Sequence, residues 1–321
     1  MKMGKYYIGV DLGGTNIAIG LTDENYNIIK KSSVPTLAER GADAIAHDMA
    51  ELAKKVCEDA GISISDVEGA GIAAPGTVNP ESGVIEYANN IRFRDFPMAK
   101  RFSEESGIPE DKVALGNDAN LAALGEYVAG TAKGSKSAVM ITLGTGVGGG
   151  VIIDGKVLTG YAFGGAELGH MSIVYNGKKC SCGRRGCFEA YCSATALVKL
   201  TKEKFIYERD TLMHQMCDGD VNKVGGKTAF AAMKRGDEVG REVVDEFISY
   251  LACGIANLIN IFQPEMLLIG GGICNEGENL MAPLREKLNG EIYGSMKTKV
   301  AIAMLGNDAG IVGAAAAVAT K

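Results

Sequence analysis

Residues 5–22 read KYYIGVDLGGTNIAIGLT, and residues 138–158 read AVMITLGTGVGGGVIIDGKVL. Each stretch consists of an apolar segment, a turn rich in glycine and a second apolar segment, which is the pattern of two antiparallel strands joined by a tight turn. Because this pattern occurs twice, about 130 residues apart, it predicts two lobes built on the same plan.

Helical and strand patterns alternate around these hairpins. Apolar residues three and four positions apart predict helices over residues 42–60, 121–129, 190–205, 227–235 and 240–262, and short apolar runs predict strands at 69–74, 113–116 and 266–270. The alternation indicates an α/β fold. A final helix is expected from about residue 307 to 319, and residues 206–226 predict an irregular connection because they lack a clear period.

Length, composition and charge restrict the class of protein. The chain has 321 residues, of which 46% are hydrophobic and 22% are charged. A single core rarely grows beyond about 250–300 residues, so this length favours two lobes. The formal net charge of −6 disfavours nucleic acid as a partner. No apolar run approaches the roughly 18 residues that span a bilayer, so we expect no membrane span, no signal peptide and a cytoplasmic protein.

The strongest single motif is a cluster of one histidine and three cysteines, His170, Cys180, Cys182 and Cys187. Three thiolates and one imidazole form a tetrahedral Zn²⁺ site. Four protein ligands leave no open position, so the metal would be structural rather than catalytic. The alternative is three inert or redox-active thiols near an unrelated histidine.

The first glycine turn has the composition of a phosphate-binding turn. Without Cβ atoms, Gly13 and Gly14 would let backbone N–H groups approach an anionic oxygen closely, and Thr15 and Asn16 add side-chain donors. Asp11, at the end of the preceding strand, could hold Mg²⁺ or its waters beside phosphate. The same residues also occur in hairpin turns that bind no ligand, so this motif alone is weak evidence for a phosphate site.

Two further glycine runs predict close approach of a backbone to a ligand. The turn at Gly144, Thr145 and Gly146 contains more glycine than a packed strand needs. A third run, which includes Gly271 and Gly272, follows a predicted strand and could pass over a base or ribose. The alternative for both is tight strand packing or a bulge.

Asn117 and Asp118 stand between a predicted strand and a predicted helix, where α/β sheets place their chemistry. A carboxylate at this position could accept a hydroxyl proton during phosphoryl transfer. Asp118 could equally be a helix N-cap.

Carboxylates on either side of the metal motif would suit a ligand with many hydroxyl groups. Glu167 and Glu189 flank the motif, and each buried sugar hydroxyl needs a polar partner. Glu189 could instead be a solvated residue in the first turn of a helix. Asn90 could contact a ligand or form a turn.

Taken in order, these motifs resemble the ROK family (repressors, open reading frames and kinases) of the sugar kinase, heat-shock ATPase and actin superfamily, most closely its bacterial glucokinases. The resemblance covers nearly the whole chain. It rests on DLGGTN at 11–16, APG at 74–76, NDAN at 117–120, LGTGVGGG at 143–150, GAELGH at 165–170, CSCGRRGCFE at 180–189 and IGGG at 269–272.

The resemblance implies two RNase H-like lobes around a cleft. The N-terminal lobe would comprise residues 1–118 and 305–321, with a C-terminal helix returning to it, and the C-terminal lobe would comprise residues 119–304. ATP would contact Asp11, Gly13, Gly14, Thr15, Asn16, Gly144, Thr145, Gly146, Gly271 and Gly272. The sugar would contact Gly76, Asn90, Asn117, Asp118, Glu167, His170 and Glu189.

By the same resemblance, the chain would transfer the γ-phosphoryl group of ATP to the 6-hydroxyl of glucose, with Asp118 as general base, Mg²⁺ on the phosphates and structural Zn²⁺ in the cysteine motif. The alternatives are a kinase for N-acetylglucosamine, N-acetylmannosamine, mannose or fructose, and a non-catalytic sugar-binding regulator. A homodimer or homotetramer is expected. The chain departs from many family glucokinases at residues 91–96, which read IRFRDF, and it has no tryptophan.

Overall fold

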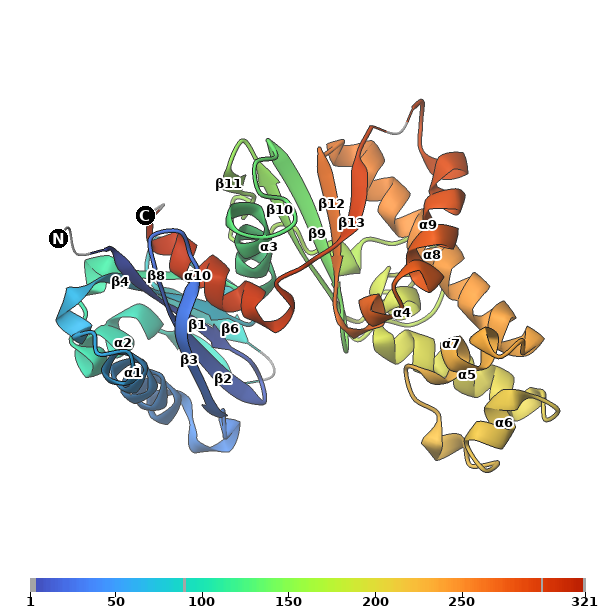
Figure 1. Cartoon of the computed structure of the whole chain (residues 1–321), viewed down its shortest axis with the longest axis horizontal. Helices are drawn as coiled ribbons and strands as arrows, with labels where there is room; N and C mark the ends of the chain where they lie inside the picture. Colours follow the sequence, from blue (N-terminus) through green and yellow to red (C-terminus); the bar gives the residue numbers. More distant parts are fainter. Residues whose placement is uncertain (1–3, 89–90, 296, 320–321) are drawn as a thin grey trace. The chain divides into compact units, whose positions relative to one another are not determined.

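The computed structural model describes residues 4–88, 91–295 and 297–319. The chain forms two compact units (Figure 1). The first unit comprises Met1–Ala138, Gly150–Ala166 and Ala303–Lys321, and the second comprises Val139–Gly149 and Glu167–Ile302.

A five-stranded sheet forms the centre of the first unit. Its order is β3-β2-β1-β4-β8, with bounds Ile28–Pro35 (β3), Asn16–Thr22 (β2), Tyr6–Leu12 (β1), Val67–Ala74 (β4) and Val113–Asn117 (β8). The first glycine-turn hairpin is β1–β2, while β1 pairs in parallel with β4, and β4 with β8. The carboxyl ends of β1, β4 and β8 therefore meet at one sheet edge, where Asp11 pairs with Ala73, and Ala74 with Asn117.

Helices cover both faces of this sheet. Helices α1 (Ala42–Asp59) and α2 (Met98–Ser106) pack on one face, in a core with Ile8, Val10 and Ile72. Helices α3 (Asp118–Val128) and α10 (Ala309–Ala319) pack on each other, and α10 contacts β1 and β4.

Glycines at paired positions of β1 and β4 allow α10 to lie close to the sheet. A Cβ at Gly9 would lie 1.9 Å from the carbonyl oxygen of Ile311, and one at Gly71 would lie 1.8 Å from that of Ala314. Alternate strand residues point to opposite faces, so Ile8 and Val10 face the other helices. The face of the sheet with glycines therefore packs against α10, and the face with bulky apolar side chains packs against α1.

The second five-stranded sheet has the order β11-β10-β9-β12-β13. Its strands are Lys156–Val157 (β11), Val147–Ile153 (β10), Ser137–Leu143 (β9), Met266–Gly270 (β12) and Lys299–Ile302 (β13). In the first sheet β2 and β3 lie on one side of β1, and β4 and β8 lie on the other. In the second sheet β10 and β11 lie on one side of β9, and β12 and β13 lie on the other. The predicted α/β fold with a duplicated plan is confirmed by this match in strand order.

The described residues also contain a smaller sheet, with the order β5-β6-β7. Its strands are Thr77–Asn79 (β5), Val84–Ala88 (β6) and Phe93–Phe96 (β7).

The helices of the second unit include one long helix, α8. They are α4 (Glu189–Cys192), α5 (Ala194–Tyr207), α6 (Leu212–Met216), α7 (Thr228–Lys234), α8 (Glu238–Phe262) and α9 (Glu278–Glu291). By length and composition α8 could cross a membrane, but 56% of its most apolar window is buried inside the fold. It contacts α4, α5, α7 and α9, which is the environment of a core helix.

Residues 206–226 contain more structure than their sequence indicates. Helix α6 begins after Thr211, whose hydroxyl accepts a hydrogen bond from the His214 N–H at 3.2 Å. The prediction of an irregular connection missed this helix, because five residues are too few to establish a helical period.

The division of the chain also differs from the predicted boundaries. The prediction assigned all of 119–304 to the C-terminal lobe, whereas residues 119–138 and 150–166 fall in the first unit. For residues 119–138 the reason is the packing of α3 on α10, where a Cβ at Gly313 would lie 1.6 Å from the carbonyl oxygen of Leu121.

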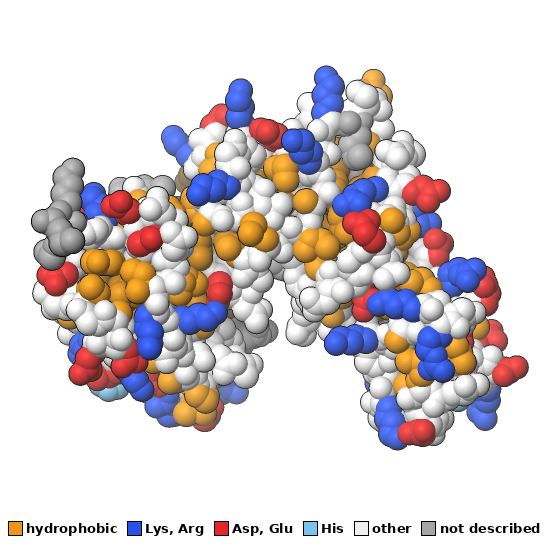
Figure 2. All heavy atoms as spheres, viewed as in Figure 1, with side chains coloured by type: hydrophobic (Ala, Val, Ile, Leu, Met, Phe, Trp, Pro, Cys, Tyr) orange, Lys and Arg blue, Asp and Glu red, His pale blue; other side chains and the backbone are white. Residues whose placement is uncertain are grey.

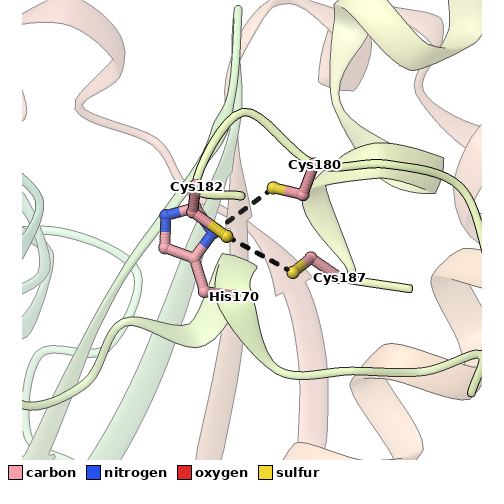
Figure 3. A group of neighbouring side chains, drawn as sticks. All are labelled: His170, Cys180, Cys182 and Cys187. Atoms are coloured by element: carbon pink, nitrogen blue, oxygen red, sulfur yellow. Dashed lines mark hydrogen bonds between the residues drawn. The ribbon is translucent and has the colours of Figure 1, made fainter. Parts of the chain in front are cut away.

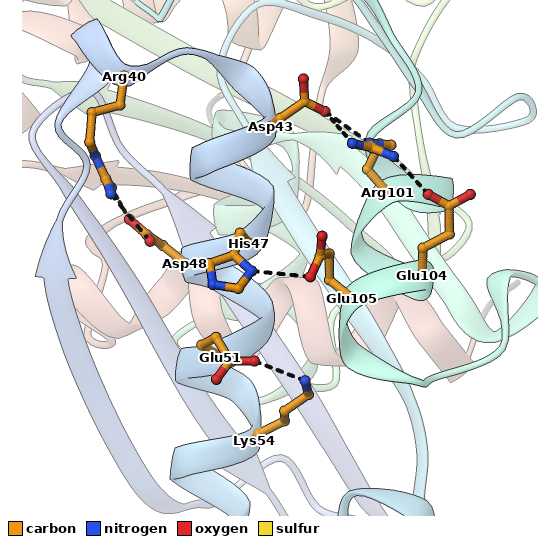
Figure 4. A network of polar contacts seen from close by, with 9 residues as sticks. All are labelled: Arg40, Asp43, His47, Asp48, Glu51, Lys54, Arg101, Glu104 and Glu105. Carbon is orange, nitrogen blue, oxygen red and sulfur yellow. Dashed lines mark hydrogen bonds and ion pairs between the residues drawn. The ribbon is translucent and has the colours of Figure 1, made fainter.

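Charged side chains of both signs are interspersed on the face shown in Figure 2. Between α1 and α2, Arg101 bonds Asp43 at 2.6 Å and Glu104 at 3.0 Å, and His47 lies 3.1 Å from Glu105 (Figure 4). Exposed pairs of this kind stabilise a fold little. The attachment of α1 and α2 therefore depends on their buried apolar faces.

Candidate active site and metal centre

Asp11 occupies the carboxyl end of β1, where the first turn of α10 packs on it. A Cβ added at Gly310 would lie 2.6 Å from the Asp11 carboxyl carbon. Burial, and secondarily the negative charge of Asp118, raise the pKa of Asp11 from 3.8 to about 6. The Asp11 carboxylate is an oxygen donor of the kind that Mg²⁺ prefers, and it lies near the charge of Asp118.

Asn117 positions the start of α3. Its Oδ1 accepts a hydrogen bond from the Asn120 N–H at 3.1 Å, which makes Asn117 the N-cap of the helix. Its Nδ2 donates to the carbonyl oxygen of Gly76 at 3.1 Å. One amide therefore joins the helix start to the loop after β4.

Asp118 is the first residue of α3 and not its cap, so the N-cap alternative for Asp118 is wrong. Its Oδ1 accepts from the neighbouring Ala119 N–H at 2.8 Å. Because Asn117 caps the helix, the N-cap hydrogen bond of α3 does not depend on Asp118.

The loop at Gly76 can be formed only by glycine. Its φ is +88°, and a Cβ there would lie 2.1 Å from the carbonyl oxygen of Tyr87. Asn90, which was predicted to contact the sugar, lies outside the described residues.

The first glycine turn is held by a threonine that sequence reasoning missed. The buried Thr36 donates its hydroxyl to the Gly13 carbonyl oxygen at 2.7 Å, and its N–H to the Thr15 carbonyl oxygen at 2.8 Å. Gly14, Thr15 and Asn16 remain exposed. Thr36 follows a strand with no local motif, so only the fold reveals its role.

The second turn is anchored to the start of α5. The Gly144 carbonyl oxygen accepts from the Ala194 N–H at 2.8 Å, and the Thr145 carbonyl oxygen accepts from the Thr195 hydroxyl at 2.8 Å. The backbone of Gly144 and Thr145 is thereby fixed while both residues stay exposed.

The third glycine turn follows β12 in the same unit. Gly271 has φ +100°, and a Cβ there would lie 2.3 Å from the Leu143 carbonyl oxygen, whereas nothing lies within 4 Å of a Cβ at Gly272. Gly271 therefore packs on the end of β9, and Gly272 presents an open backbone.

Glu189 links the second glycine turn to the cysteine loop. Its Oε2 accepts from the Val147 N–H at 3.1 Å, and its Oε1 accepts from the Ser181 hydroxyl at 3.0 Å. A Cβ at Gly146 would lie 2.3 Å from Oε2. Glu189 is thus half-buried and hydrogen-bonded, and the alternative of a solvated helix residue is wrong.

The four ligand atoms of His170, Cys180, Cys182 and Cys187 all lie within 4.8 Å of one another. The Cys182 and Cys187 sulfurs are 3.7 Å apart, and the Cys180 sulfur lies 3.7 Å from His170 Nδ1 (Figure 3). Zn–S bonds of about 2.3 Å in a tetrahedron place two sulfurs roughly 3.8 Å apart, whereas a disulfide needs about 2.05 Å. The group therefore has the spacing of a metal centre, and all eight cysteines of the chain are free.

The backbone of the cysteine loop also suits a thiolate site. Gly186 has φ +81°, and a Cβ there would lie 1.7 Å from the Val174 carbonyl oxygen. Hydrogen bonding from the Arg184 backbone lowers the pKa of Cys182. Figure 3 shows the second ring nitrogen of His170 pointing away from the sulfurs. Glu167 is exposed and precedes a short helical turn at Leu168–His170.

The predicted site residues therefore form two groups, each within one unit. The first unit brings together Asp11, the first glycine turn, Gly76, Asn117 and Asp118. The second brings together the second glycine turn, Glu189 and the cluster of His170 with three cysteines.

Comparison with known proteins identifies relatives that match this chain almost end to end. A glucokinase of Thermotoga maritima is 38% identical over 314 residues, covering 96% of this chain and 95% of its own length. A glucokinase of Halalkalibacterium halodurans is 36% identical, covering 96% and 93%. A crystal structure of a ROK family glucokinase from Streptomyces griseus, in complex with glucose and AMPPNP, matches with TM-score 0.81 and 34% identity, covering 98% of this chain and 100% of that one.

The family model of the ROK family matches residues 7–321. This match begins within β1 and includes both glycine hairpins, the Asn117–Asp118 pair and the cysteine loop. The chain therefore belongs to the ROK family.

Proposed function

We propose that this protein is an ATP-dependent glucokinase that phosphorylates the 6-hydroxyl of glucose. The observation that carries the proposal is the 36–38% identity to two glucokinases over 96% of the chain. The pairing of Asp11 with Asp118 at one sheet edge supports it, because phosphoryl transfer needs a base and metal-binding oxygens together.

In this mechanism Asp118 accepts the proton of the glucose 6-hydroxyl as the hydroxyl oxygen attacks the γ-phosphorus of ATP, and ADP leaves. Asn117 keeps Asp118 in place through its cap and its bond to Gly76. Asp11 would hold Mg²⁺ or its waters, and the ion when bound would neutralise negative charge on the phosphates of ATP. Backbone amides of the turns at Gly13–Thr15 and Gly144–Gly146 would stabilise the developing negative charge.

The cysteine loop would hold structural Zn²⁺. His170 would bind the ion through Nδ1 and direct its other nitrogen to a sugar hydroxyl, a division of roles that fixes its tautomer. Glu189 and Glu167 would accept hydrogen bonds from the remaining hydroxyls. Cytoplasmic location and a homodimeric or homotetrameric state stay predictions.

The test is ADP release with Mg-ATP in the presence of glucose, N-acetylglucosamine, N-acetylmannosamine, mannose or fructose, with a sugar-free blank. We expect kcat/KM for glucose to exceed the others at least about tenfold. Preference for an N-acetyl sugar would contradict the substrate but leave the kinase, whereas no sugar-stimulated release would overturn the kinase itself.

Replacing one zinc ligand should remove the metal and weaken glucose binding together. We expect Cys182→Ser to lose bound zinc and to raise the glucose KM about tenfold or more, because loss of the ion releases His170 and loosens the loop that holds Glu189. Zinc content by atomic absorption and glucose kinetics are the measurements.

The matched control is Cys253→Ser, which changes a half-buried cysteine of α8 outside the metal centre. It should retain zinc and KM. If Cys182→Ser loses its zinc with an unchanged KM, the metal does not support the sugar pocket.

A further inference from the structure

Ser181 stands in the cysteine loop between two of the expected zinc ligands, Cys180 and Cys182. The loop closes on itself at this point, because the Gly183 N–H donates to the Cys180 carbonyl oxygen at 3.1 Å and the Cys180 N–H donates to the Arg184 carbonyl oxygen at 2.9 Å. Ser181 is therefore a central residue of a hydrogen-bonded turn. Its side chain is exposed, so its hydroxyl is presented to solvent from a backbone that is held in place.

The Ser181 hydroxyl and a backbone N–H hold the two oxygens of Glu189. The hydroxyl donates to Oε1 at 3.0 Å, and the Val147 N–H donates to Oε2 at 3.1 Å. The backbone of Glu189 follows Phe188, whose side chain is fully buried. A carboxylate has about four acceptor positions on its two oxygens. Glu189 is therefore oriented from both sides while each oxygen can still accept a hydrogen bond from a ligand hydroxyl.

Binding of zinc would leave the orientation of Oε1 to Ser181. The Cys180 thiol is also placed to donate to Oε1, since its sulfur lies 3.6 Å away. A cysteine binds zinc as a thiolate, which has no proton to donate and repels the carboxylate. Water could reach this exposed position, but a water molecule is not attached to the loop and does not fix the direction of Oε1.

We propose that Ser181 is a positioning residue for the sugar, because its hydroxyl holds the Glu189 carboxylate in the orientation that accepts hydrogen bonds from sugar hydroxyls. The inference rests on the proposed function, in which Glu189 contacts glucose. A carboxylate that is not held in advance must be ordered when the sugar binds, and this ordering weakens affinity. The bond from Val147 keeps Oε2 at the second glycine turn, so the loss of Ser181 should weaken the sugar and not the nucleotide.

The test is Ser181→Ala in the full, zinc-loaded chain, with glucose and AMPPNP binding measured by calorimetry and turnover measured with Mg-ATP. We expect the dissociation constant and KM for glucose to rise about fivefold, the value of one net hydrogen bond. Values of kcat at saturating glucose and of the dissociation constant for AMPPNP should stay within about twofold. Zinc content and Tm should not change. Ser181→Thr keeps the hydroxyl and should restore glucose binding.

The matched control is Ser172→Ala, which removes another exposed hydroxyl, one that donates to the Val174 carbonyl oxygen at 3.4 Å. It should bind glucose as the unmodified chain does. Unchanged or tighter glucose binding by zinc-loaded Ser181→Ala, or equal weakening in Ser181→Ala and Ser181→Thr, would overturn the proposal. Loss of zinc from Ser181→Ala would also overturn it, by assigning Ser181 to the metal centre. These outcomes leave the proposed kinase intact, whereas an unmodified chain that binds no sugar would overturn both.

Discussion

Asp118→Asn is expected to lower kcat at least about a hundredfold while the dissociation constant for glucose changes by less than about twofold. An asparagine keeps the shape and one carbonyl oxygen, which can still accept the Ala119 N–H. It cannot accept a proton from the 6-hydroxyl. Because Asn117 caps α3, the substitution should leave the helix intact. Single-turnover ADP formation measures the chemistry, and calorimetry measures glucose binding.

The control is Asp111→Asn, an exposed carboxylate in the turn before the opposite end of β8. It should retain full turnover. Near-normal kcat in Asp118→Asn would remove Asp118 from the role of base. A large loss of glucose affinity with unchanged kcat would make it a binding residue instead.

The repeated hairpin was a reliable guide to the fold because its signal is local. A strand, a glycine turn and a second strand occupy consecutive residues, and the two sheets confirm both copies. The course of α10 is different, since residues 309–319 reach β1 and β4 through glycines at positions 9 and 71. Contacts between residues that are far apart in the sequence leave no local pattern. Only the resemblance to the family therefore indicated that this helix returns to the first lobe.

Some features of the candidate site could also be predicted from local sequence, and others could not. The cysteine centre could be predicted from spacing alone, because metal ligands must converge within a few ångströms and a short loop with glycine can bring them together. Thr36 could not be predicted, because it contributes through contacts to residues more than twenty positions away. For residues 117 and 118 the sequence left open which one caps the helix, and the hydrogen bonds of Asn117 show that Asn117 is the cap. The role of Asp118 as base stays a prediction.

Asp11→Asn should stabilise the substrate-free protein at neutral pH while it damages catalysis. A raised carboxyl pKa means that the folded protein holds this proton to higher pH than the unfolded chain does. Between pH 3.8 and about 6 the folded state therefore binds more protons, and stability falls as the pH rises through this window. Above it, the full cost of the buried charge is present, up to about 3 kcal/mol for a shift of this size.

Urea unfolding of Asp11→Asn and the unmodified protein, at pH 8 and just below pH 4 without Mg²⁺, measures this cost. The variant should be more stable at pH 8 by up to about 3 kcal/mol, and most of the difference should vanish at the lower pH, where folded Asp11 is neutral and unfolded Asp11 is about half protonated. Asp118→Asn should give a smaller gain, because burial raises the pKa of Asp11 more than the neighbouring charge does. Equal stability of Asp11→Asn and the unmodified protein at both pH values would mean that the charged form of Asp11 does not destabilise the fold. A gain would mean that the fold retains a costly charge where the proposed reaction needs an oxygen ligand for a divalent cation.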